Sequence, residues 1–299
     1  MRYYLAPMEG VTTWIYRRAH ASVYEPLDKY FIPFLEPHEK RDFKKKELDE
    51  ILPEHNEGIH VVPQILTNRA DGFIRLGKAL KGLGYEEVNL NLGCPSKTVS
   101  VKGKGSGFLA YPEELDHFLE EIFSGLDMKI SVKTRIGKDD PEEFERLLEI
   151  YNKYEMEELI IHPRVQADLY RNEPRRDVYR MAREKSRNPV CYNGDLFVES
   201  YLKNFLEEFP EEDRVMIGRG LIIHPGLVSG QDDKKLVWKF HDLVYQGYLE
   251  KDGDQNALYR MKELWFYQIH QFPEADKYAK KLKKVQKKAD YEQIIRELF

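Results

Sequence analysis

The chain has 299 residues, of which 41% are hydrophobic and 12% aromatic, and this composition excludes a disordered protein and allows a substantial core. The formal net charge of −5 argues against indiscriminate binding to nucleic acid, although it is compatible with a local basic patch. No run approaches the ~18 apolar residues of a membrane span, and the opening MRYYLAPMEG has no apolar signal core.

The cysteines point to a reducing compartment. There are two, Cys94 and Cys191, which make no disulfide framework, and no CxxC or HExxH pattern predicts a zinc site. We therefore expect a cytoplasmic protein that binds neither a metal nor a membrane, and we expect a monomer. Cys191 lies inside an apolar run and is expected in the core, whereas Cys94 lies on the turn that ends the run NLNLGCPSK (89–97).

Short apolar, β-branched runs recur through the first three-quarters of the chain and predict eight strands. In chain order they are YYLAPM (3–8), YFIPFL (30–35), HVVPQIL (60–66), EVNLNL (87–92), KISVKTR (129–135), ELIIHPR (158–164), PVCYNG (189–194) and RVMIGRG (214–220).

Most intervals between these runs have helical apolar spacing, notably 73–83, 113–123 and 142–151. Pro112 and Pro141 stand at expected first-turn positions, where a missing N–H costs nothing. Alternation of strand and helix repeated eight times predicts a (β/α)8 TIM barrel. A doubly wound open sheet is the alternative, and it is disfavoured because no GxGxxG follows the first run.

In such barrels the active site lies at the carboxyl ends of the strands, so polar residues at those ends are informative. Taken singly, each has an ordinary structural explanation, but their convergence on one rim indicates a functional site. These residues are Pro7, Met8, Glu9, Gly10, Gln64, Asn91, Cys94, Lys133, Arg135, His162, Arg164, Asn193, Gly194, Asp195, Gly218, Arg219 and Gly220.

The loops after the seventh and eighth strands, NGD and GRG, are where barrels of this kind commonly hold a phosphate. Glycine lets backbone N–H groups approach an anion, and Arg219 can add a charged contact. Lys133 and His162, together with Gln64, suit a planar ring that gains negative charge, as a flavin does on reduction. The alternatives are ordinary glycine turns and a water-filled polar mouth.

After Leu227 the barrel pattern stops and helical, aromatic-rich sequence follows, interrupted by Gly253 and Pro273. We therefore predict a barrel domain over 1–230 and a helical domain over 231–299. The aromatic residues of the second domain, including Trp238 and Trp265, are expected to form the core of a helical bundle rather than a platform for stacking bases.

The segment 277–288 carries seven lysines and no acid. On a single helix, one stripe would contain lysines and the opposite face would be apolar. The stripe consists of Lys277, Lys281, Lys284 and Lys288, and the opposite face of Leu282, Val285 and Ala289. A solvated surface is the ordinary interpretation of such a charge run.

The chain resembles the tRNA-dihydrouridine synthases, flavin enzymes that reduce a uridine in transfer RNA. The PMEGV opening and the LWFYQI segment are most similar to the bacterial branch that acts on the D-loop. The resemblance covers most of the barrel in the family's order, through LAPMEGVT (5–12), QILTN (64–68), NLNLGCPSKTV (89–99), GKGSGFLAYPEEL (103–115), SVKTRIG (131–137), IIHPR (160–164), CYNGD (191–195) and VMIGRGLIIHPGL (215–227).

The resemblance implies FMN as cofactor, NADPH as reductant and tRNA as partner. It places Pro7 and Met8 along the flavin ring, and Gln64, Lys133 and His162 at its polar atoms. It assigns the phosphate to Asn193, Gly194, Asp195, Gly218 and Arg219, proton donation to Cys94, and the uracil to Asn91, Arg135 and Arg164. The sequence departs from the family pattern at Pro163 and at Tyr170-Arg171-Asn172, where the family has a small residue and YxG.

The implied reaction explains why a cysteine follows the fourth strand. Hydride from the reduced flavin is expected at C6 of uracil, leaving an enolate that needs a proton at C5 from the opposite face. A thiol with a pKa of ~8.5 is mostly protonated at neutral pH and can donate that proton, whereas a thiolate cannot. The glycine-bearing stretch 102–107 can let this loop close over the substrate.

A uridine in a folded tRNA must be turned outward before it can reach a ring inside a barrel. The C-terminal lysines Lys281, Lys284 and Lys288 are therefore predicted to bind tRNA phosphates.

Three other functions remain open at this point. One is an FMN barrel that reduces a free pyrimidine or enone metabolite. A second is a lyase in which Lys133 forms a Schiff base with a carbonyl substrate. A third is a catalytically silent RNA-binding barrel.

Overall fold

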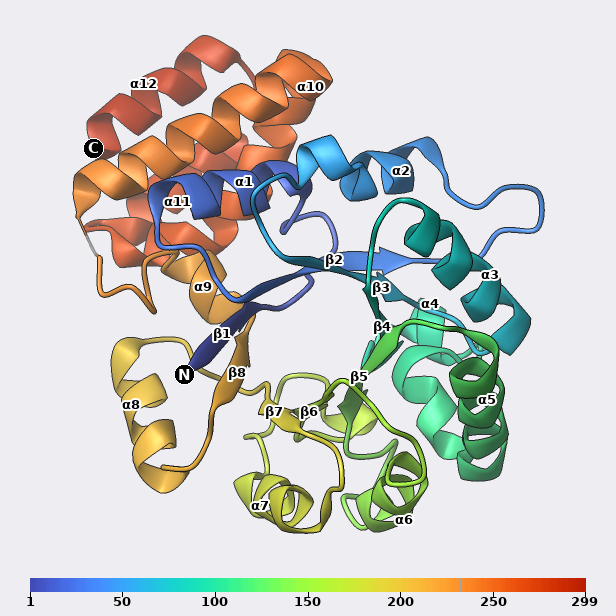
Figure 1. Ribbon diagram of the computed structural model, residues 1–299. Coiled ribbons are helices and arrows are strands. Elements are labelled where there is room, and N and C mark those ends of the chain that lie inside the picture. The colour runs from blue at the N-terminus through green and yellow to red at the C-terminus, as the bar shows by residue number, and fades with distance from the viewer. Residues whose placement is uncertain (232) are drawn as a thin grey trace.

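A computed structural model describes residues 1–231 and 233–299. Eight parallel strands follow one another around a closed barrel, and β8 pairs with β1 to close it (Figure 1). The predicted TIM-barrel fold is therefore confirmed. The strands are β1 (Arg2–Leu5), β2 (Lys29–Leu35), β3 (Val61–Ile65), β4 (Glu87–Leu92), β5 (Lys129–Arg135), β6 (Leu159–His162), β7 (Val190–Tyr192) and β8 (Arg214–Ile217).

The ends of the strands show where the chain leaves the barrel wall. β4 and β5 have their predicted bounds, but β1, β6, β7 and β8 end two or three residues before the predicted runs do. Pro7 has no N–H to donate to a ladder, and Gly218 has φ −102° and ψ −98°, outside the β region. The polar residues that follow these strands consequently lie in loops.

Helices cover the outside of the barrel (Figure 1), and those predicted at 73–83, 113–123 and 142–151 are confirmed as α3, α5 and α6. Pro112 is the first residue of α5, but Pro141 precedes α6 by two residues and lies in a turn. Among the residues described, no helix is both long and apolar enough to cross a membrane. The barrel helices are α1 (Trp14–Val23), α2 (Lys45–Ile51), α3 (Ala70–Gly82), α4 (Lys97–Ser100), α5 (Pro112–Gly125), α6 (Glu143–Tyr151), α7 (Arg176–Lys185), α8 (Glu199–Glu208) and α9 (Arg219–Ile223).

The barrel interior is divided between apolar and polar side chains. Alternate residues of each strand point inward, and on most strands these form a compact apolar cluster. Cys191 belongs to this cluster and is fully buried, which confirms its expected place in the core. The inward positions of β4 and β5 are instead polar, and several of them are buried. The apolar cluster contains Tyr4, Ala6, Phe31, Val62, Ile160, Cys191 and Met216.

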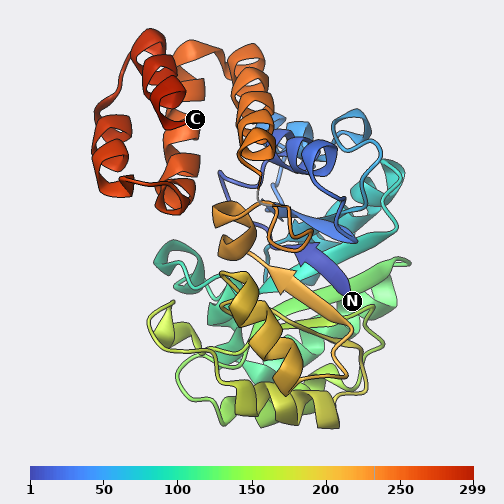
Figure 2. The same cartoon turned by 90° about the vertical axis from the view of Figure 1, so that its left-hand side faces the viewer.

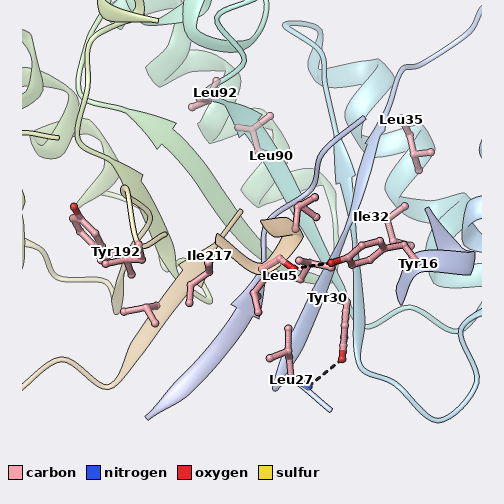
Figure 3. Packing of buried hydrophobic residues seen from close by; sticks show 14 of the residues in the cluster. Leu5, Tyr16, Leu27, Tyr30, Ile32, Leu35, Leu90, Leu92, Tyr192 and Ile217 are labelled. Carbon is pink, nitrogen blue, oxygen red and sulfur yellow. Dashed lines mark hydrogen bonds between the residues drawn. The ribbon is translucent and has the colours of Figure 1, made fainter. Parts of the chain in front are cut away.

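A second, larger core fills the space between the strands and the helices. Leu5 of β1 and Ile217 of β8 face this layer, where the ring of Tyr16 on α1 also lies (Figure 3). The Tyr16 hydroxyl donates to the carbonyl of Leu221, 2.8 Å away, and so ties α1 to the segment that follows β8. The packing of α1 against β1 and β8 therefore supports the ends of these two strands from outside the barrel.

The C-terminal residues form a separate group of helices beside the barrel (Figure 2). They are α10 (Lys234–Gln268), α11 (Ala275–Lys284) and α12 (Lys288–Leu298). Gly253, with φ 75° and ψ 172°, breaks α10 into two halves. His241 on the first half and Trp265 on the second both hydrogen-bond to the Tyr291 hydroxyl, so the halves fold back on each other. The first half also packs on the barrel.

The aromatic residues of this group are mostly in its core, as predicted. Trp265 is buried, and Phe240 packs edge-on against Tyr16 of α1 with 5.1 Å between ring centroids. The prediction is wrong for Trp238, which is 39% exposed at the edge of the bundle and packs one side against Phe299.

The lysine-rich segment 277–288 is not one helix, which corrects the predicted stripe. α11 ends at Lys284 and α12 begins at Lys288, because Val285 and Lys287 have extended backbone conformations. Leu282 and Val285 are buried as predicted, and the break allows Val285 to enter the core. Ala289, predicted on the same apolar face, is exposed.

Candidate active site

A cavity of about 390 Å³ opens at the carboxyl ends of the barrel strands. A larger depression of about 750 Å³ lies at the amino ends of β4 and β5, away from the predicted site residues. The first cavity is lined by Ala6, Pro7, Met8, Gly93, Lys133, Arg135, His162, Tyr170, Asn193, Gly194, Asp195, Phe197, Gly218, Arg219, Gly220, Phe266 and Tyr267. It is therefore the place where most of the predicted residues meet.

Lys133 is a partly buried cation at the wall of the cavity. Burial, followed by the neighbouring Arg135 guanidinium, lowers the pKa of the Lys133 ammonium to about 8. The other groups that act on this pKa are the thiols of Cys191 and Cys94, and no carboxylate is among them. Within the part of the chain that the structure describes, Lys133 is thus a cation on which no carboxylate acts, and an anionic ligand would stabilise its charge.

Arg135 lines the cavity, but its guanidinium already forms hydrogen bonds with backbone carbonyls of the protein. It donates to the carbonyls of Gly93 at 3.0 Å, Val165 at 2.9 Å and Leu169 at 2.7 Å. Arg135 therefore ties the loop after β4 to the loop after β6, and adds positive charge to the wall between them.

His162 is held in a defined protonation state. Its Nδ1 lies 2.6 Å from the carbonyl of Asn193, which can only accept, so Nδ1 carries the proton. Its Nε2 then accepts from Arg164 at 3.3 Å. Burial, and then the nearby cations Arg135, Lys133 and Arg164, hold the pKa of the imidazole well below its usual value. His162 is consequently neutral at pH 7.

Asp195 lines the cavity and links two arginines. Its carboxylate accepts from Arg164 at 3.0 Å and 2.5 Å and from Arg219 at 2.8 Å. The Arg219 guanidinium lies between the rings of Tyr170 and Phe197, with Cζ 4.8 Å and 4.7 Å from their centroids. These contacts orient Arg219 at the wall of the cavity.

Gly218, which follows β8, keeps one end of the cavity open. A Cβ on Gly218 would lie 3.4 Å from the Ala6 Cβ and 3.9 Å from the Met8 sulfur, both on the cavity wall. A Cβ on Gly194 would collide with the ring of Tyr192. Together with Arg219, this open cradle fits a phosphate, and the adjacent Lys133 fits a ring that accepts negative charge. The residues present therefore fit FMN.

Cys94 lies on a tightly held turn next to the cavity. The Oδ1 of Asn91 accepts from the N–H groups of Gly93 at 3.0 Å and Cys94 at 2.9 Å. The carbonyl of Cys94 accepts from the Ser106 hydroxyl at 2.8 Å, so the glycine-bearing stretch 102–107 packs against this turn. Burial raises the pKa of the thiol, and the charge of Glu9 adds to that rise. The thiol is consequently protonated at neutral pH.

Three of the predicted site residues lie behind the cavity wall. Gln64 and Asn91 are buried and bind each other, and Arg164 is buried against Asp195. None of them lines the cavity. The predicted lysines Lys281, Lys284 and Lys288 lie on the C-terminal helices and line no part of it either.

Sequence reasoning missed the aromatic part of the wall. Tyr170 and Phe266 are 55% and 70% exposed, and together with Phe197 and Tyr267 they border the cavity. The strained backbone of Leu169, with φ 53°, turns the chain just before Tyr170. Phe266 and Tyr267 belong to the LWFYQI segment (264–269) that carries part of the family resemblance, but the sequence does not show that they border the cavity, because this depends on how α10 folds back.

The fold and the cavity define a class: a (β/α)8-barrel protein with a cavity lined by cationic side chains at the carboxyl ends of its strands. The chain belongs to the dihydrouridine synthase family, whose model matches residues 4–299. This is the family whose motifs the sequence contains.

Similar proteins of known name extend this assignment. The chain is 28% identical to tRNA-dihydrouridine synthase B of Pasteurella multocida over 228 residues, 76% of this chain and 67% of that protein. It is 23% identical to the tRNA-dihydrouridine(16) synthase of Vibrio parahaemolyticus over 318 residues, 97% of this chain and 94% of that protein. A solved complex of 2-naphthoyl-CoA reductase superposes with a TM-score of 0.58 at 11% identity, covering 81% of this chain and 51% of that one. At that identity the likeness supports the fold alone.

Proposed function

We propose that the protein reduces the C5=C6 bond of a specific uridine in tRNA to dihydrouridine, with FMN as cofactor and NADPH as reductant. Bound FMN would supply the hydride that goes to C6. Membership of the dihydrouridine synthase family supports this function. The observation that carries it is a protonated thiol, Cys94, beside a cavity lined by Lys133, Arg135 and Arg219.

The residues that would hold FMN fall into two groups. Asn193, Gly194, Gly218 and Arg219 would bind the phosphate, with Asp195 orienting Arg219 through their 2.8 Å contact. Pro7 and Met8 would lie along the ring, and Lys133 and His162 would contact its polar atoms. Gln64 is buried one layer below the cavity wall and would support this region from beneath.

Cys94 would donate the proton to C5 of uracil. Because burial raises the thiol pKa, the thiol keeps its proton at neutral pH and can act as a general acid. Arg135 would add positive charge beside the uracil as an enolate develops. Asn91 would act by holding the Cys94 turn, and Arg164 by holding Asp195 and His162, rather than by facing the base.

The division into a catalytic domain (1–230) and a tRNA-binding domain (231–299) is part of this proposal. Lys281, Lys284 and Lys288 would contact tRNA phosphates from the second domain. Lys281 lies 2.6 Å from Glu297 and Lys288 lies 3.4 Å from Asp254, whereas Lys284 is exposed. An RNA phosphate would therefore compete with two carboxylates of the protein, and binding should depend on salt.

The proposal is tested by mapping dihydrouridine in tRNA from cells with and without this gene, and by incubating purified protein with FMN, NADPH and unmodified tRNA. One uridine should become dihydrouridine only when the gene is present. Free uridine at the same concentration should not be reduced. Reduction of free uridine or uracil, with tRNA left unmodified, would overturn the proposal in favour of a metabolite reductase.

A further inference from the structure

A chain of buried polar side chains crosses the barrel interior beneath the Cys94 turn. Asn91 donates from Nδ2 to Oε1 of Gln64 at 2.6 Å, and Gln64 donates from Nε2 to Oδ1 of Asn89 at 2.8 Å. Asn89 in turn donates from Nδ2 to the hydroxyl of Ser131 at 2.9 Å, and Ser131 donates to Oε1 of Glu87 at 2.6 Å. The chain thus connects β3, β4 and β5.

The two ends of this chain fix the direction of every bond in it. At one end, Oδ1 of Asn91 must accept, because two backbone N–H groups point at it. The Nδ2 group of Asn91 can then only donate to Oε1 of Gln64, which leaves the Nε2 group of Gln64 as a donor to Asn89. The Nδ2 group of Asn89 is in turn the donor to the Ser131 hydroxyl. At the other end the carboxylate of Glu87 is an obligatory acceptor, and it accepts the hydroxyl proton of Ser131.

The Glu87 end is anchored to a buried ionic cluster. Lys29 donates to Glu87 at 2.7 Å and to Glu158 at 2.6 Å, and all three side chains are buried. The intermediate residues Asn89 and Ser131 are fully buried as well, so water cannot replace a missing partner. The charge at one end of the barrel therefore favours the same orientation of the Asn91 amide that the two backbone N–H groups require.

We propose that Ser131 and Asn89 are positioning residues for Cys94. They keep the Asn91 amide in the orientation that closes the Cys94 turn, and they do so without contacting cofactor or substrate. The consequence for uridine reduction rests on the proposed function, but the effect on the turn itself does not.

The test compares Ser131→Ala, which removes the link, with Ser131→Thr, which keeps the hydroxyl. The readout is the rate at which iodoacetamide alkylates Cys94 in protein free of flavin and RNA, followed by mass spectrometry of the peptide. Cys191→Ala is the control, because Cys191 is equally buried in the interior but lies outside the chain.

In Ser131→Ala the amide of Asn89 loses its acceptor, so the chain holds the Asn91 amide less firmly under the turn. The alkylation rate should rise about fivefold, as expected for one lost hydrogen bond. Ser131→Thr and Cys191→Ala should stay within about twofold of the unmodified protein, although Cys191→Ala loses thermal stability. With the complete enzyme, kcat of Ser131→Ala should fall about tenfold while KM for tRNA changes little.

An unchanged alkylation rate in folded Ser131→Ala would overturn the inference. If Ser131→Ala does not fold, Asn89→Leu serves in the same assay, because leucine has a similar size, carries no charge, and removes both the donor to Ser131 and the acceptor of Gln64. An unchanged rate there would be equally decisive. If the rate rises but the unmodified protein never reduces uridine, the positioning role stands and the proposed function fails.

Discussion

The barrel mouth and the C-terminal helices both carry many cations, but they hold them in different ways. Lys133 in the mouth is partly buried, no carboxylate among the described residues acts on its pKa, and desolvation lowers that pKa to about 8. Lys281 and Lys288 on the C-terminal helices each form an ion pair with an acid at the surface. The first arrangement costs folding free energy and is relieved by an anionic ligand, whereas the second is nearly neutral for stability.

This difference predicts which kind of ligand each region should bind tightly and which it should bind weakly. A desolvated cation at a fixed position suits a small ligand that is bound tightly and in one orientation. Exposed cations on long side chains suit a large polyanion that is bound loosely and released by salt. The following predictions test this contrast, from the largest expected effect to the smallest.

Removing the thiol of Cys94 should have the largest effect. Cys94→Ala should lower the rate of uridine reduction by about 10²–10⁴-fold, because a general acid contributes that much. FMN binding, followed by flavin absorbance, should be unchanged, since Cys94 does not line the cavity. Cys191→Ala is the matched control and should keep its activity. Normal turnover in Cys94→Ala would remove the thiol from the reaction.

Replacing the partly buried cation should separate binding from stability. Lys133→Met should weaken FMN binding by about tenfold to a hundredfold, because a charged contact is lost. The melting temperature of the flavin-free protein should stay the same or rise, since a desolvated ammonium is removed. Lys138→Met, at an exposed position after β5, should change neither quantity. A large loss of stability in Lys133→Met would show that Lys133 has a structural partner.

The pH dependence of stability should report the Lys133 pKa. Between about pH 8 and the ordinary value of 10.5, the unfolded chain binds a proton at Lys133 that the folded chain does not. The stability of the flavin-free protein should therefore rise with pH through this window, relative to Lys133→Met. Parallel stability curves for the two proteins would contradict the lowered pKa. Melting temperatures measured from pH 7 to pH 10 give the comparison.

The smallest effect should come from the C-terminal lysines. Replacing Lys281, Lys284 and Lys288 with alanine should weaken tRNA binding several-fold and lower its salt dependence by about two to three units of slope. Protein stability should change by no more than about 1 kcal/mol, because surface ion pairs contribute little. The matched control replaces Lys81, Lys153 and Lys185, which also form surface ion pairs but lie on other parts of the barrel. Equal salt slopes for both triple variants would place the RNA-binding surface elsewhere.

The sequence predicted the barrel because each strand and each helix has its own local apolar pattern. It predicted the bounds of β4 and β5 fully, since β4 is buried along its length, β5 is buried at most positions, and both end in residues that stay in the ladder. The early ends of β1 and β8 depend on Pro7 and on the backbone of Gly218, which release the chain toward the cavity. Pro7 and Gly218 can be read from the sequence, but the residue at which each strand ends depends on its pairing with the neighbouring strand.

The site was only partly predictable, because the position of a residue in the chain does not show which other polar side chains it will contact. Asp195 was predicted to hold phosphate, but in the folded chain it bridges Arg164 and Arg219. The break between α11 and α12 depends on the burial of Val285, which an exposed lysine pattern does not reveal. Contacts of this kind join residues far apart in sequence and arise only from packing.

The left-handed backbone of Gly253 has a consequence for the entrance to the site. It lets the first half of α10 lie along α1 while the second half returns and presents Phe266 and Tyr267 to the cavity. A Cβ at Gly253 would meet nothing within 4 Å. The position therefore requires glycine because of its positive φ and not because a side chain would be crowded. The dihedral angles of this one residue therefore set the direction of the second half of α10, and with it the distance of two aromatic rings from the barrel axis.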